Sequence, residues 1–519
     1  MEDGSNPGAP PTAHGSSDVR KLDAIRDINN FGYKIPGLFT WSILLLLLVG
    51  ILTVPDFVLV IAQICALYLL FYLFMVVFFY PVGLIRIRRW EAHFRSGARA
   101  TDVRDDWVRH VVLIPNYKEP IEVLSRTLQS LAAQEDAQRR VIVVLAMEQA
   151  ETGAAEKVRL LREMFEDQFA HFLVTFHPAG VPGEVAGKGS NQNWAARRAR
   201  EELVDRLGIP LEHLTLTSCD ADSVLHPNYF AALTRLFATD PHRYRRFWQA
   251  PLRFDNNTWQ VPAAIRLVTY FANALQVSEL ANPVLLNFPL STYSLSFRLA
   301  DVAGYWDSAV IAEDWHMFLR CSFAAAGRVS LRPIFLPTSG NAVDGETTWQ
   351  SLTNSYQQRL RHAWGAQDVG YIFHQWPKSP QTPFISKLSC LTKVLHDHLI
   401  FSTGGLVVAA GSVLLVTLHS VSFIFMPLLN ALGDATKVGN GCVAVGMAGI
   451  LVAEHLRCRR HSHGWRPAAL LADMVTWPFL ALIMFGTLGA PVLHAQTKLM
   501  LGSPLGYVTT PKKADAPAN

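Results

Sequence analysis

Four short apolar runs decide the fold: VVLIPNY at 111–117, VIVVLAM at 141–147, FLVTF at 172–176 and LTLTSC at 214–219. Each run has the length of a buried strand and is followed by a stretch in which apolar residues recur at helical spacing. Strands that alternate with helices predict a mostly parallel sheet with helices on both faces. Because such sheets bind ligands at the carboxyl ends of their strands, the residues directly after these runs are the first candidates for a site.

The two ends of the chain are apolar, and only 17% of the 519 residues are charged. Leu38–Val54 and Phe57–Tyr80 are each close to the length that crosses about 30 Å of hydrocarbon as a helix, and Pro55 between them suits a tight hairpin. Basic residues flank this pair on both outer sides, whereas the hairpin carries none. The positive-inside rule therefore predicts cytoplasmic outer ends, and we expect an integral protein of the plasma membrane.

Further apolar stretches follow the predicted sheet, near 398–420, 441–456 and 468–493. They are candidate membrane spans, and the mixed apolar and basic segment at 382–397 is typical of an interfacial helix. Two spans before the globular region and three after it would put the C-terminus outside. One C-terminal segment could instead be re-entrant, interfacial or miscounted, and hydropathy leaves these alternatives open.

These patterns divide the chain into six segments. They are a disordered tail at 1–34, a transmembrane hairpin at 35–85, a cytoplasmic α/β domain at 105–375, an interfacial helix at 382–397, transmembrane helices at 398–495 and a tail at 496–519. Residues 1–20 are rich in Gly, Pro, Ser and Ala, which cannot bury enough surface to offset chain entropy.

Charge and cysteine content exclude two classes of function. The formal net charge is only +4, and the basic residues cluster beside apolar segments, so nucleic acid is not an expected partner. The six cysteines are scattered without a CxxC pair or zinc-type spacing, and we interpret them as reduced thiols.

Two carboxylates, Asp220 and Asp222, directly follow the strand-like run at 214–219. This spacing allows them to hold a hard divalent cation, Mg²⁺ or Mn²⁺, that bridges the two phosphates of a sugar nucleotide. A DxD triplet alone is weak evidence, because one occurs by chance in a chain of this length and a solvated turn would look the same.

Other motifs accompany this triplet in a fixed order. They are Pro115-Asn-Tyr-Lys-Glu119, Glu148, Gly187-Lys188 with Asn193, Asp220 and Asp222, Gln249-Ala-Pro251, Glu313-Asp314 and Gln358-Arg-Leu-Arg361. In this order, over roughly residues 105–370, the chain resembles glycosyltransferase family 2, and in particular the membrane-integrated branch of cellulose, chitin and hyaluronan synthases. The resemblance implies a GT-A-type, Rossmann-like nucleotide-sugar-binding domain inserted between N-terminal and C-terminal transmembrane helices.

The resemblance also implies roles for individual residues. The nucleoside would be cradled by Pro115, Tyr117, Glu119 and Glu148, the donor would contact Lys188 and Gln358, and Gln249 would belong to the acceptor site. Asp222 would be the principal metal ligand with Asp220 as its partner. For Glu119 and Glu148 taken singly, the competing interpretation is a surface carboxylate at the start of a helix.

The segment Ala312-Glu313-Asp314 resembles the TED motif of the family, with Ala in place of the usual Thr. Glycosyl transfer with inversion needs a carboxylate that removes a proton from the attacking acceptor hydroxyl, and the resemblance implies that this base is Asp314 beside Glu313. The alternative is a carboxylate pair favoured by the dipole of a helix N-terminus.

The QxxRW motif of the processive synthases is only partly matched. Gln358 and Arg361 are present, and Arg361 can grip a diphosphate with its guanidinium, but His362 stands where the Trp belongs. Trp364 lies two positions further on and is either a displaced acceptor-binding residue or a packing residue.

The leading functional prediction is an inverting, metal-dependent transfer from a UDP-sugar to a growing β-linked glycan. One alternative is a single transfer to a polyprenyl phosphate or another lipid, which His362 favours. A second, of another class, is a non-catalytic transporter or scaffold, which the retained carboxylates disfavour. The tail LMLGSPLGYVTTPKK resembles the cytoplasmic terminal segment of related bacterial membrane glycosyltransferases.

Overall fold

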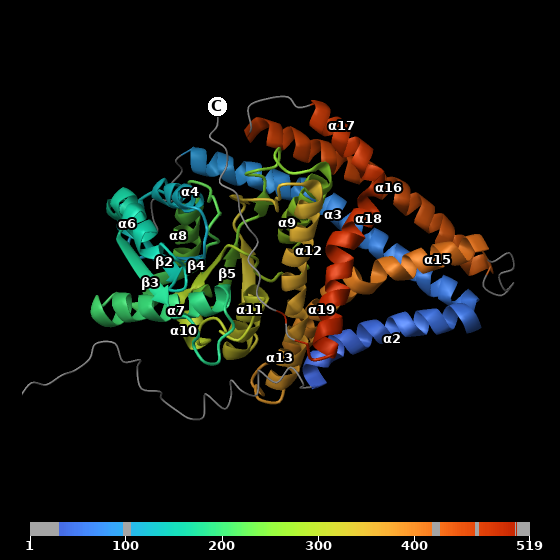
Figure 1. Cartoon of the computed structure of the whole chain (residues 1–519), viewed down its shortest axis with the longest axis horizontal. Coiled ribbons are helices and arrows are strands. Elements are labelled where there is room, and N and C mark those ends of the chain that lie inside the picture. The colour runs from blue at the N-terminus through green and yellow to red at the C-terminus, as the bar shows by residue number, and fades with distance from the viewer. Residues whose placement is uncertain (1–30, 97–104, 418–425, 462–466, 504, 506–519) are drawn as a thin grey trace, which may run out of the picture.

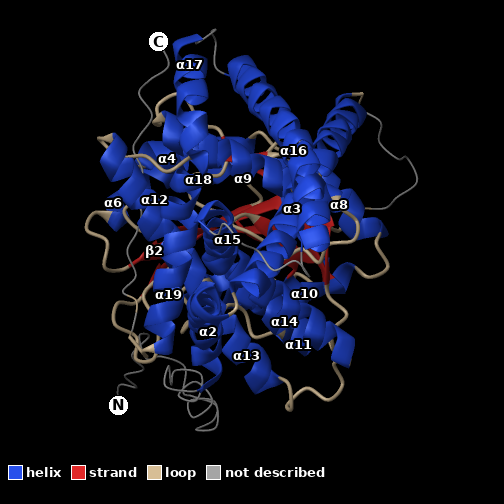
Figure 2. Cartoon of the chain, turned by 90° about the vertical axis from the view of Figure 1, so that its right-hand side faces the viewer, coloured by secondary structure: helices blue, strands red, loops and turns tan. Residues whose placement is uncertain are grey.

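The computed structural model describes residues 31–96, 105–417, 426–461, 467–503 and 505. An α/β domain lies at one end of the molecule and long helices from both ends of the chain lie at the other (Figure 1). A turned view shows the strands enclosed by helices (Figure 2).

The central sheet of the described residues has seven strands in the order β3-β2-β1-β4-β7-β5-β8. The first four strands in chain order are parallel, whereas β7 is antiparallel to both β4 and β5. The strands are β1 (Arg109–Asn116), β2 (Val141–Glu148), β3 (His171–His177), β4 (Leu214–Ser218), β5 (Arg246–Gln249), β7 (Tyr293–Ser296) and β8 (Ser330–Pro333). A small second sheet pairs β6 (Leu252–Phe254) with β9 (Thr338–Gly340).

Both faces of the sheet are buried, which explains the continuous apolar runs of its strands. Successive side chains of a strand point to opposite faces, so Val111 and Leu113 of β1 enter one core cluster and Val112 and Ile114 enter the other.

The helices that follow and cover these strands are α4 (Ile121–Ala132), α5 (Ala137–Arg140), α6 (Ala154–Phe165), α7 (Lys188–Arg200), α8 (Tyr229–Thr239), α9 (Ala263–Ala281), α10 (Phe297–Val302), α11 (Glu313–Ala324), α12 (Thr348–Ala363), α13 (Asp368–Gln375) and α14 (Phe384–Leu399).

Four helical stretches of the described chain are long and apolar enough to cross a membrane: Phe31–Thr53 (α2), Pro55–Arg95 (α3), Met426–Cys458 and Pro467–Met500. The third lies within α16 (Met426–His461), and the fourth contains α17 (Pro467–Thr476), α18 (Leu480–Met484) and α19 (Ala490–Met500). Phe384–Leu399 and Ser402–Gly411 meet at a bend of 42° and would make a fifth span if together they cross the membrane. Ser402–Gly411 includes the start of α15 (Gly405–Thr417).

The expectation of an α/β domain between apolar helices at both ends of the chain is confirmed, although several segment bounds differ. Helix α2 begins at Phe31, inside the predicted tail at 1–34, whose first thirty residues lie outside the described part. Helix α3 runs past residue 85 to Arg95. At about 1.5 Å per residue it is longer than a bilayer core is thick, and its last turns pack beside α9, where Arg86 donates to the carbonyl of Ala281 at 3.1 Å.

The long helices are joined closely to the α/β domain. At Gly83 of α3, an added Cβ would collide with Val277 of α9, so the glycine lets these two helices approach. The Ser278 hydroxyl of α9 also donates to the carbonyl of Val76 at 2.9 Å. The α/β domain is therefore fixed to the long helix α3 by the close packing of α9 and by this hydrogen bond.

Candidate active site

The predicted site residues gather where strands end. Asn116 and Glu148 close β1 and β2, and Asp220 lies two residues after β4. Since β7 is antiparallel to β4, with Tyr293 opposite Ser218, the segment before β7 arrives at the same edge. One edge of the sheet therefore collects side chains from four strands.

The centre of the site is the ammonium group of Lys188, at the first turn of α7. Its Nζ lies 2.8 Å from Asp220 Oδ1, 3.0 Å from Glu313 Oε1 and 3.4 Å from Asp314 Oδ1. Gly189 allows this approach, because a Cβ there would lie 3.3 Å from the Cβ of Glu313. Four residues from three separate sequence motifs thus meet around one ammonium group.

Glu313 and Asp314 open α11, where the helix dipole favours carboxylates. Ala312 is the N-cap and has no side-chain oxygen with which to cap the helix, which is the consequence of the Thr-to-Ala departure in the motif.

The charges of the cluster shift its proton affinities. Burial alone would lower the pKa of Lys188, but Asp220, Asp314 and Glu313 outweigh it and hold the pKa well above its ordinary value. Burial, with repulsion from Glu313 and Asp220, raises the pKa of Asp314 to about 8, against the opposing attraction of Lys188. An aspartate with a pKa near neutrality can take up a proton at physiological pH.

Asp222 is 7% exposed and faces a different neighbour, since its Oδ2 accepts from the main-chain N–H of Asn341 at 3.2 Å. The carboxylates of Asp220 and Asp222 offer hard oxygen ligands, which fit Mg²⁺ or Mn²⁺. No group of three or more His, Cys, Asp or Glu side chains within the described ranges is arranged to hold an ion. A cation here would need ligands from a substrate or water.

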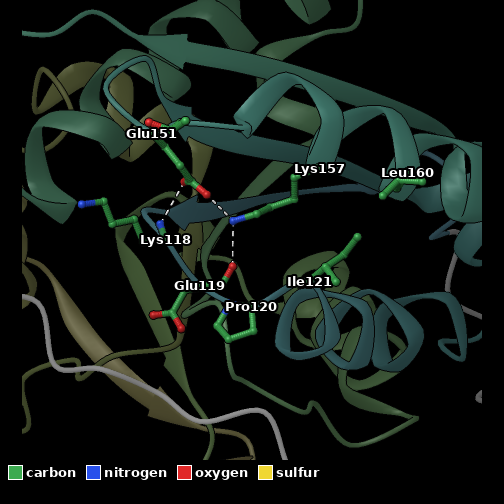
Figure 3. Close-up of a pocket in the computed structure, with 8 residues that line it drawn as sticks. Lys118, Glu119, Pro120, Ile121, Glu151, Lys157 and Leu160 are labelled. Atoms are coloured by element: carbon green, nitrogen blue, oxygen red, sulfur yellow. Dashed lines mark hydrogen bonds and ion pairs between the residues drawn. The ribbon is translucent and has the colours of Figure 1, made fainter.

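The loop after β1 is braced by Glu151, a 7% exposed carboxylate that the sequence analysis missed. Glu151 Oε2 accepts from the Asn116 side chain and the Lys118 main-chain N–H, both at 2.9 Å. Lys157 bridges Glu151 to the Glu119 carbonyl, as Figure 3 shows. An open depression of about 560 Å³ lies between this loop and α6.

Glu148 lies apart from the Lys188 cluster and pairs with a histidine. His177 Nδ1 is 3.0 Å from Glu148 and its Nε2 is 2.8 Å from Glu184. Burial would lower the pKa of His177, but the two carboxylates outweigh it and raise the pKa to about 9. Both ring nitrogens then donate, so His177 ties the end of β2 to the loop that leads into Gly187.

The remaining predicted residues divide into two groups. Gln358 and Arg361 lie on α12. The next residue of this helix, His362, is close enough to Asp220 and Lys188 for their charges to act on its pKa. Burial, followed by the charges of Arg359 and Arg361, lowers the pKa of His362 well below its ordinary value. The last turn of α12 therefore faces the cluster.

Gln249 and Trp364, both predicted to bind acceptor, are buried. Gln249 is 1% exposed and its amide bonds to main-chain groups. Trp364 is 4% exposed and packs with Val492 and Leu499 of α19. Their acceptor roles stay predictions, and burial favours packing for Trp364. Pro115 pairs with Ala146 inside the sheet, and Tyr117 directly follows β1.

Comparisons with known proteins give the family context. The model of the family described as "Glycosyl transferase family group 2" matches residues 216–486, which is more than half of the chain. No curated protein matches.

Among solved structures, the fold is similar to the mannosyltransferase PcManGT from Pyrobaculum calidifontis in complex with GDP-Man and Mn²⁺. That structure is 16% identical, covers 86% of this chain and all of its own, and has a TM-score of 0.43. A structure of residues 1–349 of S. aureus TarS in complex with UDP-GlcNAc is 13% identical, with a TM-score of 0.36, and covers 76% of this chain and 93% of its own.

Proposed function

Because the chain belongs to glycosyl transferase family group 2, it is a glycosyltransferase, and we propose that it transfers a sugar with inversion from a UDP-sugar to a growing β-linked glycan. The observation that carries the proposal is the cluster in which Asp220, Glu313 and Asp314 all lie within 3.4 Å of the Lys188 ammonium. Family membership also sets aside the alternative of a transporter or scaffold without catalysis.

Asp314 is the proposed base. The acceptor hydroxyl gives its proton to a carboxylate oxygen of Asp314 as its oxygen attacks the anomeric carbon, and the diphosphate leaves with the electrons of the broken bond. The raised pKa of Asp314 suits this role, because a base works best when its pKa lies near the working pH. Glu313 contributes to that raised pKa through its charge.

Asp222 and Asp220 are the proposed ligands of Mg²⁺ or Mn²⁺. When bound, the cation would act as a Lewis acid that neutralises charge on the leaving diphosphate. Since the described protein ligands number two, the ion is expected to arrive as a complex with the nucleotide. We expect Lys188 and Arg361, both cationic, to attract the same diphosphate, and Gln358 lies on the same helix as Arg361.

The nucleoside would lie at the ends of β1 and β2. Pro115, Tyr117 and Glu119 belong to one loop, and Glu148 ends the neighbouring strand. The Glu151 contacts hold that loop, which supports a preformed binding surface.

The second candidate is a single transfer to a polyprenyl phosphate or another lipid, and the packing of Trp364 favours it. With His362 in the Trp position and Trp364 buried against α19, the aromatic support expected of a processive synthase is weakened. The assignment of the chain to the branch of cellulose, chitin and hyaluronan synthases is therefore only proposed, and single transfer stays the second candidate.

The candidate spans support an integral membrane protein whose helices contact lipid. We propose that it lies in the plasma membrane with its α/β domain in the cytoplasm. Four crossings would keep both ends of the chain on one side, as the resemblance of the tail requires. Leu429 at the start of α16 packs with Val58 beside the hairpin, and Glu454 near its end pairs with Arg253 of the α/β domain, so α16 would cross inward and the bent segment at 384–411 would cross outward before it. Pro467–Met500 contacts the domain near both of its ends, through Asp473 and through α19, and would then be re-entrant.

The test is release of nucleoside diphosphate by the purified protein in detergent or lipid discs, with UDP- and GDP-sugars supplied in turn and glycan or polyprenyl phosphate acceptors added. Acceptor-dependent release identifies donor and acceptor together, and product sizing separates polymerisation from single transfer. No release above background with any donor would contradict the proposal.

A further inference from the structure

The segment at 282–292, between α9 and β7, supplies contacts to the catalytic cluster that no motif marks. Because β7 is antiparallel to β4, this segment ends beside Asp220. The main-chain N–H of Asp220 donates to the Thr292 hydroxyl at 3.1 Å, so the two chain segments are already joined at that point.

Ser291 contacts both halves of the proposed active site. Its main-chain N–H donates to Asp314 Oδ2 at 2.7 Å, and its hydroxyl donates to Asp220 Oδ2. Its carbonyl accepts from Lys188 Nζ at 3.3 Å. A single residue therefore bonds the proposed base, the proposed metal ligand and the cation between them.

The main chain at Ser291 is held in an unfavourable conformation. Its φ is +59°, in the left-handed region that costs a residue other than glycine about 1–2 kcal/mol. Such a conformation persists only where its surroundings over-determine it.

Gln249, the last residue of β5, provides that restraint. Its Oε1 accepts from the Leu290 N–H at 2.9 Å, and its Nε2 donates to the Thr292 carbonyl at 3.0 Å. Gln249 thus fastens the residues immediately before and after Ser291, and its side chain is 1% exposed.

We infer that Ser291, fastened by Gln249, is a positioning residue that sets Asp314 and Asp220 in register for transfer. The inference rests on the proposed function, in which Asp314 is the base and Asp220 a metal ligand. It gives Gln249 a role in aligning the base.

The geometry assigns separate tasks to the two oxygens of Asp314. Oδ2 is occupied by the Ser291 N–H, whereas Oδ1 lies 3.4 Å from Lys188, on the side of the cluster. The acceptor proton is transferred to Oδ1 as the new glycosidic bond forms and the diphosphate departs. Oδ2 can accept from Ser291 before and after this step, so the base keeps its orientation throughout.

The test compares Gln249→Leu with Gln134→Leu. Gln134 is a matched control because its amide also donates to two main-chain carbonyls and accepts from a main-chain N–H, at Phe230, on the other face of the sheet. The two variants lose hydrogen bonds of the same kinds and number, so we expect both to lose similar thermal stability. Misplacement of a catalytic group by about 1 Å can cost about 100-fold, so we expect Gln249→Leu to lower kcat by about 10- to 100-fold. We expect kcat within about twofold of wild type for Gln134→Leu.

Ser291→Gly separates the two contacts, since it keeps the N–H to Asp314 and removes the hydroxyl from Asp220. We expect an increase of about tenfold in the Kd for Mn²⁺ with the nucleoside diphosphate that wild type releases, measured by calorimetry without acceptor.

The outcomes distinguish the inference from the proposed function. Equal kcat for the two glutamine variants at saturating substrates, or an unchanged Kd for Ser291→Gly, would contradict the positioning role while wild-type release stands. Absence of release by wild type with every donor would overturn the proposed function and this inference with it.

Discussion

Two ionic clusters in this protein differ in charge balance. Around Lys188, three carboxyl groups face one ammonium group, and these side chains are 10–28% exposed. Because the pKa of Asp314 is about 8, the surplus of negative charge is close to one unit below that pH and approaches two above it. Around Glu454 of α16, two arginines, Arg253 and Arg457, balance Glu454 and Asp255. A balanced, buried cluster has no need of a further ion, whereas a surplus of negative charge near solvent attracts a cation.

The two clusters also differ in what they join. Glu454 accepts from Arg253 of β6 in the α/β domain and from Tyr80 of α3, and it lies 3.0 Å from Arg457 one turn along α16. It therefore connects the domain to two long helices. The Lys188 cluster instead joins the first turns of α7 and α11 to the loop after β4.

The largest expected effect is that of Asp314→Asn, which removes proton acceptance but keeps the shape of the side chain. We expect turnover to fall by about 10²- to 10⁴-fold with donor binding retained. Because the change also reduces the negative surplus, thermal stability should stay the same or rise. Steady-state kinetics and calorimetric nucleotide binding measure both, and wild-type turnover at saturating donor and acceptor would show that another group is the base.

Glu454→Gln should lower stability and leave turnover unchanged, which is the opposite of the result expected for Asp314→Asn. It leaves the buried Arg253 with only the Asp255 carboxylate, 3.8 Å away. Breaking a buried ion pair costs about 3–5 kcal/mol, while kcat per folded molecule stays near the wild-type value. Denaturant unfolding in detergent measures the loss. The double change of Arg253 and Glu454 to Met should recover most of it, since Arg457 keeps Asp255. A large fall in kcat of folded Glu454→Gln would contradict the division between the clusters.

Trp364→Ala tests whether the C-terminal helices serve only as support. The indole packs with α19, so we expect a loss of about 3–5 kcal/mol in the free energy of unfolding and an unchanged product-length distribution. Product sizing beside wild type decides the point. Shorter products from the folded variant would return Trp364 to the acceptor site.

The smallest expected effect is a dependence of stability on pH at His177. The pKa of His177 is raised from 6.5 to about 9, so its stabilising contribution is complete below pH 6.5 and is lost as pH rises through 9. With screening at the partly exposed glutamates, we expect about 1–2 kcal/mol. His177→Gln should flatten the stability profile of wild type between these pH values, and an unchanged slope would assign the dependence to other groups.

The sequence predicts what depends on local pattern. The runs at 111–117, 141–147, 172–176 and 214–219 form the parallel strands β1 to β4, since the period of side chains and the burial of both faces are local properties. The placement of Asp220 after a strand follows from the same pattern.

The sequence does not predict contacts that depend on distant chain segments. β7 has four residues, and its antiparallel insertion between β4 and β5 carries no periodic signal of its own. The position of β7 brings Ser291 to Asp314. The left-handed main-chain conformation of Ser291 has no signature in the amino-acid composition. The pairing of Glu148 with His177 and the burial of Gln249 likewise depend on strand order, which single-sequence reasoning did not provide.

We expect the surplus of negative charge around Lys188 and Asp222 to take up a metal–nucleotide complex. The most direct measurement is calorimetric binding of UDP and GDP to wild type and Asp222→Ala, each with Mn²⁺ and in EDTA. We expect wild type to bind one of these nucleotides with Mn²⁺ and to lose that binding in EDTA, and we expect folded Asp222→Ala to bind under neither condition. Equal affinity of wild type in Mn²⁺ and in EDTA, or retention of metal-dependent binding by Asp222→Ala, would contradict it.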